Sequence, residues 1–241
     1  MLTPVLGKIL ESAMATRLGR IGIAQSWFGP AHAGGTPHVG VTELLQATSH
    51  ALRTNPRTAI LVMDIKGAFN GAKVQPMKEA MHALGISHQV QEWTASFMTS
   101  RTVNPRRGET QGPTFQVQEC LPQGPPASPV LFAMLISDVG RQFYEDKIFV
   151  DDLQLMQFGT ARGPVNLVEL EAGSCRLVKP LRDKGLDIDY GKTRLLISPK
   201  PENPVSISIE GHQVTNEESL LYLGTIFQAI IPHYHQFSRN I

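Results

Sequence analysis

Three aspartates mark the ends of apolar segments in this 241-residue chain, and they constrain its fold more than any other feature. Asp64 follows the apolar run TAILVM at residues 58–63, a run typical of a strand buried on both faces. Asp151 and Asp152 divide the segment KIFVDDLQLMQF at residues 147–158, and its two apolar halves predict a hairpin with the acidic pair at its tip. Because strand ends converge at the edge of a sheet, we expect the three carboxylates to share one site.

A cluster of carboxylates requires a compensating positive charge, because close anions do not all stay ionised without one. Hard oxygen ligands with room for water and phosphate favour Mg²⁺, with Mn²⁺ as a substitute. Two such ions about 4 Å apart stabilise the attacking and leaving oxygens of a displacement at phosphorus. The sequence therefore predicts a two-metal site. The alternative is an acidic pair in a surface turn, and the apolar flanks on both sides argue against it.

The charge of the chain is balanced overall but unevenly distributed. The 22 Lys+Arg and 21 Asp+Glu give a net charge of +1, which does not indicate a protein that binds nucleic acid through bulk charge. Residues 1–110 carry 11 basic and 6 acidic side chains, whereas residues 111–160 carry 2 basic and 6 acidic ones. No apolar window is long enough to predict a membrane span. Cys120 and Cys175 are too few for a disulfide framework or a four-thiolate zinc site, and we predict buried thiols.

Helical and strand periodicities follow one another in mixed order, which predicts one continuous α+β unit. Helices are expected from Pro4 to about Leu18, at 42–52, from Pro76 to 84, from Pro129 to about Phe143, and at 165–184 with breaks or kinks at Gly173 and Pro180. Loops are expected at 19–37 and 122–129, and a basic loop or hairpin at 100–112 runs into 115–121. Further strands are expected at 186–188, 194–197, 205–209 and 220–226, with a hairpin turn at Gly211-His212.

Five segments, taken in order, resemble the motif series of reverse transcriptases. They are AILVMDIKGAFN at 59–70, LPQGPPASPVLF at 121–132, FVDDLQL at 149–155, GLDIDYGKTRLL at 185–196 and LYLGTIF at 221–227. The series is most similar to that of LINE-type non-LTR retrotransposons, and PVLGKILESAMATRL at the start resembles the block that begins their fingers. The resemblance spans residues 1–227 and implies a right-hand polymerase palm with partial fingers, in which helices flank an antiparallel catalytic sheet. Residues 228–241 would be a C-terminal tail where a thumb begins.

The resemblance also implies an RNA-directed DNA polymerase. Its partners would be an RNA template, a DNA primer and dNTPs, and it would release pyrophosphate, use two Mg²⁺ ions and work in the nucleus. Asp64, Asp151 and Asp152 match the metal ligands, with the Ile65 carbonyl as a further oxygen. Lys192 matches the lysine that protonates the leaving pyrophosphate; from the sequence alone, a solvated turn lysine is the alternative.

Other matched positions would contact the substrates. Phe69 matches a ring that excludes a 2′-hydroxyl, although a core phenylalanine at a strand-to-helix corner is the alternative. Gln123 and Gly124 match the loop that touches template and nucleotide, because glycine permits close backbone approach. Leu223 and Gly224 match the turn that grips the primer. Three arginines would follow a nucleic-acid backbone or be merely solvated: Arg101, Arg106 and Arg107.

The sequence departs from this pattern at several points. A stretch of the form FG-x-RPGRST is replaced by FGPAHAGGTPHVG from residue 28 onward, which leaves only His32 or His38 as weak substitutes for a triphosphate-binding arginine. Pro125 replaces the usual serine, and His233 with His235 lacks a third metal ligand. Because the chain also stops where a thumb would begin, two alternatives stay open: a decayed, inactive retrotransposon fragment and a non-catalytic remnant that binds nucleic acid.

Overall fold

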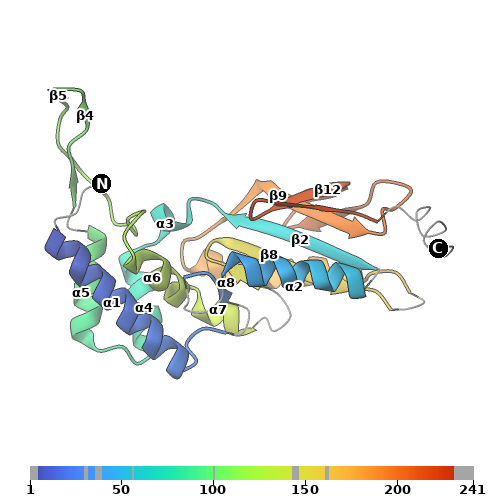
Figure 1. The fold of residues 1–241 in the computed structure, drawn as a ribbon, viewed down its shortest axis with the longest axis horizontal. Coiled ribbons are helices and arrows are strands. Elements are labelled where there is room, and N and C mark those ends of the chain that lie inside the picture. The colour runs from blue at the N-terminus through green and yellow to red at the C-terminus, as the bar shows by residue number, and fades with distance from the viewer. Residues whose placement is uncertain are drawn as a thin grey trace.

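The computed structural model describes residues 5–29, 32–35, 40–55, 57–99, 101–142, 147–160 and 163–230. It confirms the expected α+β fold, in which a seven-stranded sheet is packed between helices (Figure 1). None of the helices within these ranges is long and apolar enough to cross a membrane. His38, His233 and His235, which the sequence singles out, lie outside the described residues.

The sheet positions the predicted site through its central antiparallel strands. Its order is β1 (His32–Ala33), β7 (Lys147–Phe149), β8 (Asp152–Phe158), β2 (Thr58–Ile65), β9 (Ile188–Ser198), β11 (His212–Glu217) and β10 (Ser206–Ile209). The β2 strand pairs antiparallel with both β8 and β9, whereas the β1–β7 and β11–β9 pairs are parallel. The hairpin expected from the strand at 205–209 and the turn at Gly211-His212 is present, because β10 and β11 pair antiparallel around Gly211.

Helices cover one face of the sheet. The inner layer is α4 (Val74–Ala83), α6 (Ala127–Leu135) and α8 (Leu167–Asp183), while α1 (Val5–Ala24) and α5 (His88–Thr99) lie against α6 and α4. The short helices α3 (Ala68–Gly71) and α7 (Ser137–Gln142) complete this side. From β2, Leu61 and Met63 enter this core. Because side chains alternate along a strand, the other face of β2 carries Ile60, Val62 and Asp64.

That second face is covered by α2 (Val41–Thr54) and by the hairpin of β12 (Ser219–Tyr222) and β13 (Thr225–Gln228). Thr48 of α2 and Gln154 of β8 make a buried hydrogen bond of 3.1 Å, which fixes the helix over the sheet. Smaller strands form a hairpin that projects from the rest of the molecule in Figure 1: β3 (Thr102–Val103), β4 (Arg106–Arg107), β5 (Thr110–Gln111) and β6 (Phe115–Gln116).

Several helix predictions were wrong in their boundaries. The α1 helix continues through Gly19 to Ala24; both Gly19 and Gly22 are buried, and a Cβ at Gly22 would clash with the Phe28 ring. Four apolar side chains in its first half instead face solvent: Val5, Leu6, Ile9 and Leu10. The α8 helix runs unbroken through Gly173 and Pro180, whereas the helix expected from Pro129 divides at Ile136 into α6 and α7. The α4 helix begins two residues before Pro76, still within the first turn, where proline is tolerated, and the α5 helix was not predicted.

Two strand predictions were also wrong. The segments at 186–188 and 194–197 are not separate strands, because one strand, β9, runs from Ile188 through 194–197 to Ser198. The segment at 220–226 is a hairpin that turns at Leu223 (φ 46°) and Gly224 (φ 80°). Two successive left-handed residues form a tight turn that suits the twist of paired strands. The family resemblance predicted a turn at Leu223-Gly224, but leucine itself gives no sign of a left-handed conformation, because only glycine adopts it without strain.

Replacing Gly173 with alanine is expected to raise the free energy of unfolding by about 0.5–1 kcal/mol, since alanine restricts the unfolded chain. An added Cβ would lie 3.5 Å from Leu155 Cδ2, an ordinary packing distance. Urea denaturation at equilibrium measures the change. Gly29→Ala is the control, because there a Cβ would clash with the Gly140 backbone and lower the stability. An equal rise in both variants would contradict the packing argument.

Candidate active site

The three aspartates lie at one end of the central strands. Asp64 of β2 is the direct cross-strand neighbour of Asp152 at the start of β8. Asp151 precedes it in the turn between β7 and β8, where Val150 has a φ of 56°. The Ile65 amide donates to the Asp151 carbonyl over 3.1 Å, which ties the end of β2 to the tip of the hairpin. The ladder thus brings together Asp64 and Asp152, which are 88 positions apart in the chain.

The carboxylates of the turn carry unfavourable negative charge. Burial, followed by the charges of Asp151 and Asp64, raises the pKa of Asp152 to about 6. The pKa of Asp151 is also raised, chiefly by burial and then by the charge of Asp64. Because both shifts disfavour the ionised form, the turn lacks enough positive charge to balance its carboxylates.

Lys192 supplies one positive charge at this site. Its ammonium lies 2.7 Å from Asp64 Oδ2 and 3.8 Å from Asp189 Oδ2, on a side chain that is 64% exposed. A bulge in β9 places it there: Val62 pairs with Arg194 and Asp64 pairs with Asp189, so residues 190–193 stand outside the regular ladder. The hydrogen bond to Asp64 raises the pKa of Lys192, which keeps the amine protonated.

The carboxylates of Asp64, Asp151 and Asp152 are the kind of ligand that a hard divalent cation takes, although their side chains do not converge on one point. Within the described ranges, no group of three or more His, Cys, Asp or Glu side chains converges closely enough to hold a metal ion. Asp64, Asp151 and Asp152 offer only carboxylate oxygens, the ligands that Mg²⁺ prefers, and the two in the turn are short of positive charge. The exposed Lys192 can move away from Asp64, so the chemistry of these residues fits the predicted ions.

Replacing Asp152 with asparagine is expected to stabilise the metal-free protein at pH 7–8 but not near pH 4. The folded-state pKa of Asp152, about 6, lies above its ordinary value of 3.8, so the folded protein binds more protons between these values. The stability that Asp152 contributes is therefore full below pH 3.8 and is lost as the pH rises through about 6. Thermal melts across this range in the presence of a chelator measure the difference. Parallel curves for both proteins would show that Asp152 is not destabilised by its surroundings.

The expected substrate-binding residues lie in three different loops and turns. Phe69 of α3 is half-buried, and its ring stacks on Phe132 at 5.4 Å, so it serves the core while part of the ring stays accessible. Gln123 and Gly124 are exposed in the loop before α6, and Gly124 has a φ of 102°. Leu223 and Gly224 form the β12–β13 turn described above, beside the face that carries the aspartates.

Two sets of predicted basic groups need correction. His32 is only 5% exposed, and burial, followed by the charge of Arg141, lowers its pKa to about 4, so it is neutral and cannot replace a triphosphate-binding arginine. Arg101 is committed to the fold, because its Nη2 donates to the carbonyls of Met98 (3.0 Å) and Cys120 (2.5 Å). Arg106 and Arg107 of β4 remain exposed on the projecting hairpin. Cys120 and Cys175 are free and only half-buried, less than predicted.

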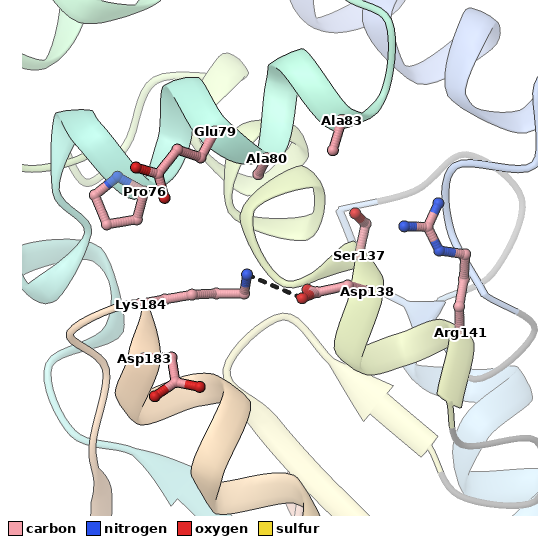
Figure 2. A pocket seen from close by; sticks show the side chains of 9 residues that line it. All are labelled: Pro76, Glu79, Ala80, Ala83, Ser137, Asp138, Arg141, Asp183 and Lys184. Carbon is pink, nitrogen blue, oxygen red and sulfur yellow. Dashed lines mark ion pairs between the residues drawn. The ribbon is translucent and has the colours of Figure 1, made fainter.

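A separate cavity of ≈ 240 Å³ lies on the helical side, between α4, α7 and the end of α8. Lys184 crosses it to pair with Asp138 Oδ2 at 3.0 Å (Figure 2). Glu79, Asp183 and Arg141 stand around this ion pair. None of the predicted site residues lines the cavity, so it is not part of the carboxylate site.

The sequence did not single out two residues that belong to the site. Asp189 stands opposite Asp64 and is a second neighbour of Lys192. Tyr222 is 2% exposed on the same face as the aspartates. Asp189 follows Ile188 at the end of the strand predicted at 186–188, as Asp64 follows the strand predicted at 58–63, and this parallel was the available signal. Nothing in the apolar segment around Tyr222 distinguishes its hydroxyl from a packing residue.

Comparison with known proteins gives a consistent result. The profile of a family described as "Reverse transcriptase (RNA-dependent DNA polymerase)" matches residues 1–227. Apo telomerase from Candida tropicalis, truncated from its C-terminal domain, aligns at 12% identity and a TM-score of 0.54, covering 90% of this chain and 43% of that chain. Telomerase from Candida albicans, in complex with a TWJ fragment of telomeric RNA, aligns at 13% identity and a TM-score of 0.56, covering 88% and 37%.

Because the sequence identities are only 12% and 13%, these likenesses establish the fold alone. The chain spans less than half the length of the solved structures that it matches. A search of curated proteins finds no significant match.

Proposed function

This chain belongs to the reverse transcriptase (RNA-dependent DNA polymerase) family, and from that premise we propose that it provides the palm of an RNA-directed DNA polymerase. The observation that carries the proposal is the meeting of Asp64, Asp151 and Asp152 at one end of the central strands, beside Lys192. Its substrates would be an RNA template, a DNA primer and dNTPs. The order of the five sequence motifs favours an origin in a LINE-type non-LTR retrotransposon.

The site residues would divide the chemistry among them. Asp64, Asp151 and Asp152, with the Ile65 carbonyl, would hold two Mg²⁺ ions, or Mn²⁺ in their place. When bound, these ions supply charge stabilisation to the attacking and leaving oxygens. The primer 3′-hydroxyl would give up its proton to solvent, and its oxygen would form a bond to the α-phosphorus of the dNTP as the bond to pyrophosphate breaks. Lys192 is protonated in its contact with Asp64, so it has a proton to give to the pyrophosphate oxygen that leaves.

The surrounding loops would position the substrates. The accessible part of Phe69 would lie under the sugar of the dNTP, where a 2′-hydroxyl would clash. Gly124 lets the backbone approach the template and the nucleotide, and Gln123 can donate to a base or a phosphate. The tight Leu223-Gly224 turn would hold the primer, and Arg106 with Arg107 would contact a nucleic-acid backbone.

Primer extension on an RNA template tests the proposal. The chain is incubated with a DNA primer annealed to RNA, dNTPs and Mg²⁺ or Mn²⁺, and products are resolved by length. Extension that follows the template sequence supports the polymerase. Binding of the primer–template without extension would indicate the non-catalytic remnant. A folded chain with neither activity would indicate the decayed fragment, which the missing arginine and the buried His32 would then explain.

A further inference from the structure

A buried hydroxyl without a partner lies on the same face of the sheet as the aspartates. Tyr222 is 2% exposed, and within the described part of the chain its hydroxyl has no hydrogen-bond partner. Tyrosine hydroxyls usually find a partner when they are buried, and an unpaired polar group in a protein core costs free energy. The position of this hydroxyl therefore calls for a functional explanation.

The sheet determines what Tyr222 faces. Tyr222 packs in the core of the second face together with Ile60 and Val62 of β2 and Met156 of β8. Side chains alternate along strands, so Asp64 is on the same face as Ile60 and Val62. By the same alternation, Asp152 shares a face with Gln154 and Met156. The tyrosine thus belongs to the layer that carries both carboxylates.

The register of the strands relates Tyr222 to one of these two carboxylates, because Phe149, the cross-strand neighbour of Asp152, packs against the same cluster as Tyr222. Burial raises the pKa of Tyr222 strongly, and the charge of Asp152 raises it further. No side chain in the described ranges makes a hydrogen bond or an ion pair with Asp152, whereas Asp64 is held by Lys192. Among the described residues, the Tyr222 hydroxyl is therefore a hydrogen-bond donor without an acceptor, and the Asp152 carboxylate, whose charge acts on it, is an acceptor without a side-chain donor.

We infer that Tyr222 is a positioning residue: once a divalent metal ion is bound, its hydroxyl, which has no partner among the described residues, donates a hydrogen bond to the Asp152 carboxylate and orients that carboxylate toward the ion. This inference rests on the proposed function, because it needs Asp152 to bind metal. Groups that hydrogen-bond to a metal-ligating carboxylate fix its orientation, and their loss weakens metal binding about 10–100-fold. Tyr222 also directly precedes the Leu223-Gly224 turn, so one residue would link the primer-holding turn to the metal site.

The test compares Mn²⁺ binding to the wild-type chain and to Tyr222→Phe by calorimetric titration without nucleic acid. Phenylalanine keeps the packing of the ring and removes only the hydroxyl. We expect Mn²⁺ affinity to fall about tenfold or more while the thermal midpoint of the metal-free protein stays the same or rises. Tyr190→Phe is the matched control, because the Tyr190 hydroxyl contacts Glu210 at 3.2 Å on an exposed part of the surface, and its loss should leave the affinity unchanged.

The outcomes separate this inference from the function on which it rests. Equal Mn²⁺ affinity in the wild type and Tyr222→Phe, together with a more stable variant, would show an unsatisfied hydroxyl without a positioning role and overturn the inference alone. Failure of the wild-type chain to bind Mn²⁺ would overturn the metal site of the proposed polymerase, and the positioning role with it. If Tyr190→Phe lowers the Mn²⁺ affinity as much as Tyr222→Phe does, the positioning role of Tyr222 would also be overturned.

Discussion

Asparagine in place of Asp151 is expected to reduce template-directed primer extension about a thousandfold or more while the chain stays folded. An amide is a poor substitute for an anionic metal ligand, and metal ions contribute several kcal/mol of charge stabilisation to such transition states. Each 1.36 kcal/mol corresponds to a factor of about ten in rate. Initial extension rates at saturating dNTP and Mg²⁺ measure the loss. Stability should not fall, because burial already disfavours the charge that the substitution removes.

The matched control for Asp151 is Asp183→Asn. Asp183 is exposed at the end of α8 and lines the cavity on the helical side, away from the carboxylate site. The control removes the same charge from the chain, so it leaves extension unchanged if the effect is specific to the site. Similar losses in both variants would indicate a general dependence on net charge. Undiminished extension by Asp151→Asn would remove Asp151 from the metal site.

Truncation of Phe132 to alanine is expected to lower the free energy of unfolding by about 3–5 kcal/mol, because it removes a large buried ring and leaves a cavity. Phe132 is 0% exposed in α6, where it packs in the main core and stacks on Phe69. The loss also takes away the support of Phe69, so discrimination between deoxyribonucleotides and ribonucleotides should weaken in any surviving activity. Urea denaturation at equilibrium gives the stability change.

Leu221→Ala is the control for Phe132, because Leu221 is 67% exposed on β12. It should change the stability by no more than about 0.5 kcal/mol. Equal effects of the two substitutions would contradict the placement of Phe132 in the core. An unchanged free energy of unfolding in Phe132→Ala would also contradict the placement of Phe132 in the core.

The sequence correctly predicted those elements whose hydrophobic pattern matches the way their side chains are buried in the fold. The apolar run at 58–63 is buried on both faces and becomes β2, and the Asp-Asp pair does interrupt a hairpin. The break expected in α8 at Pro180 did not occur, because packing of Leu177, Val178 and Leu181 outweighs the single lost hydrogen bond. The end of α1 could not be predicted either, since the close fit at Gly22 depends on the Phe28 ring, which folds back onto the helix from beyond its end.

Within the site, sequence reasoning identified ionisable residues better than it identified their surroundings. Asp64 and Asp152 were expected to converge, and the β2–β8 register places them side by side. His32 was considered as a ligand for phosphate, but its burial depends on contacts that only the fold reveals. Arg101 has the same chemistry as Arg106, and only the tertiary structure shows that one is tied to carbonyls and the other is free of them.

The bulge in β9 makes the site sensitive to the length of a segment as well as to its composition. Residues 190–193 carry Lys192 out of the ladder before pairing with β2 resumes at Arg194. Deletion of one residue here would shift the register and turn every later side chain of β9 to the opposite face. Substitutions such as Thr193→Ser should therefore be tolerated far better than single-residue deletions. Among relatives, gaps in this segment would be a better indicator of lost activity than changes of its amino acids.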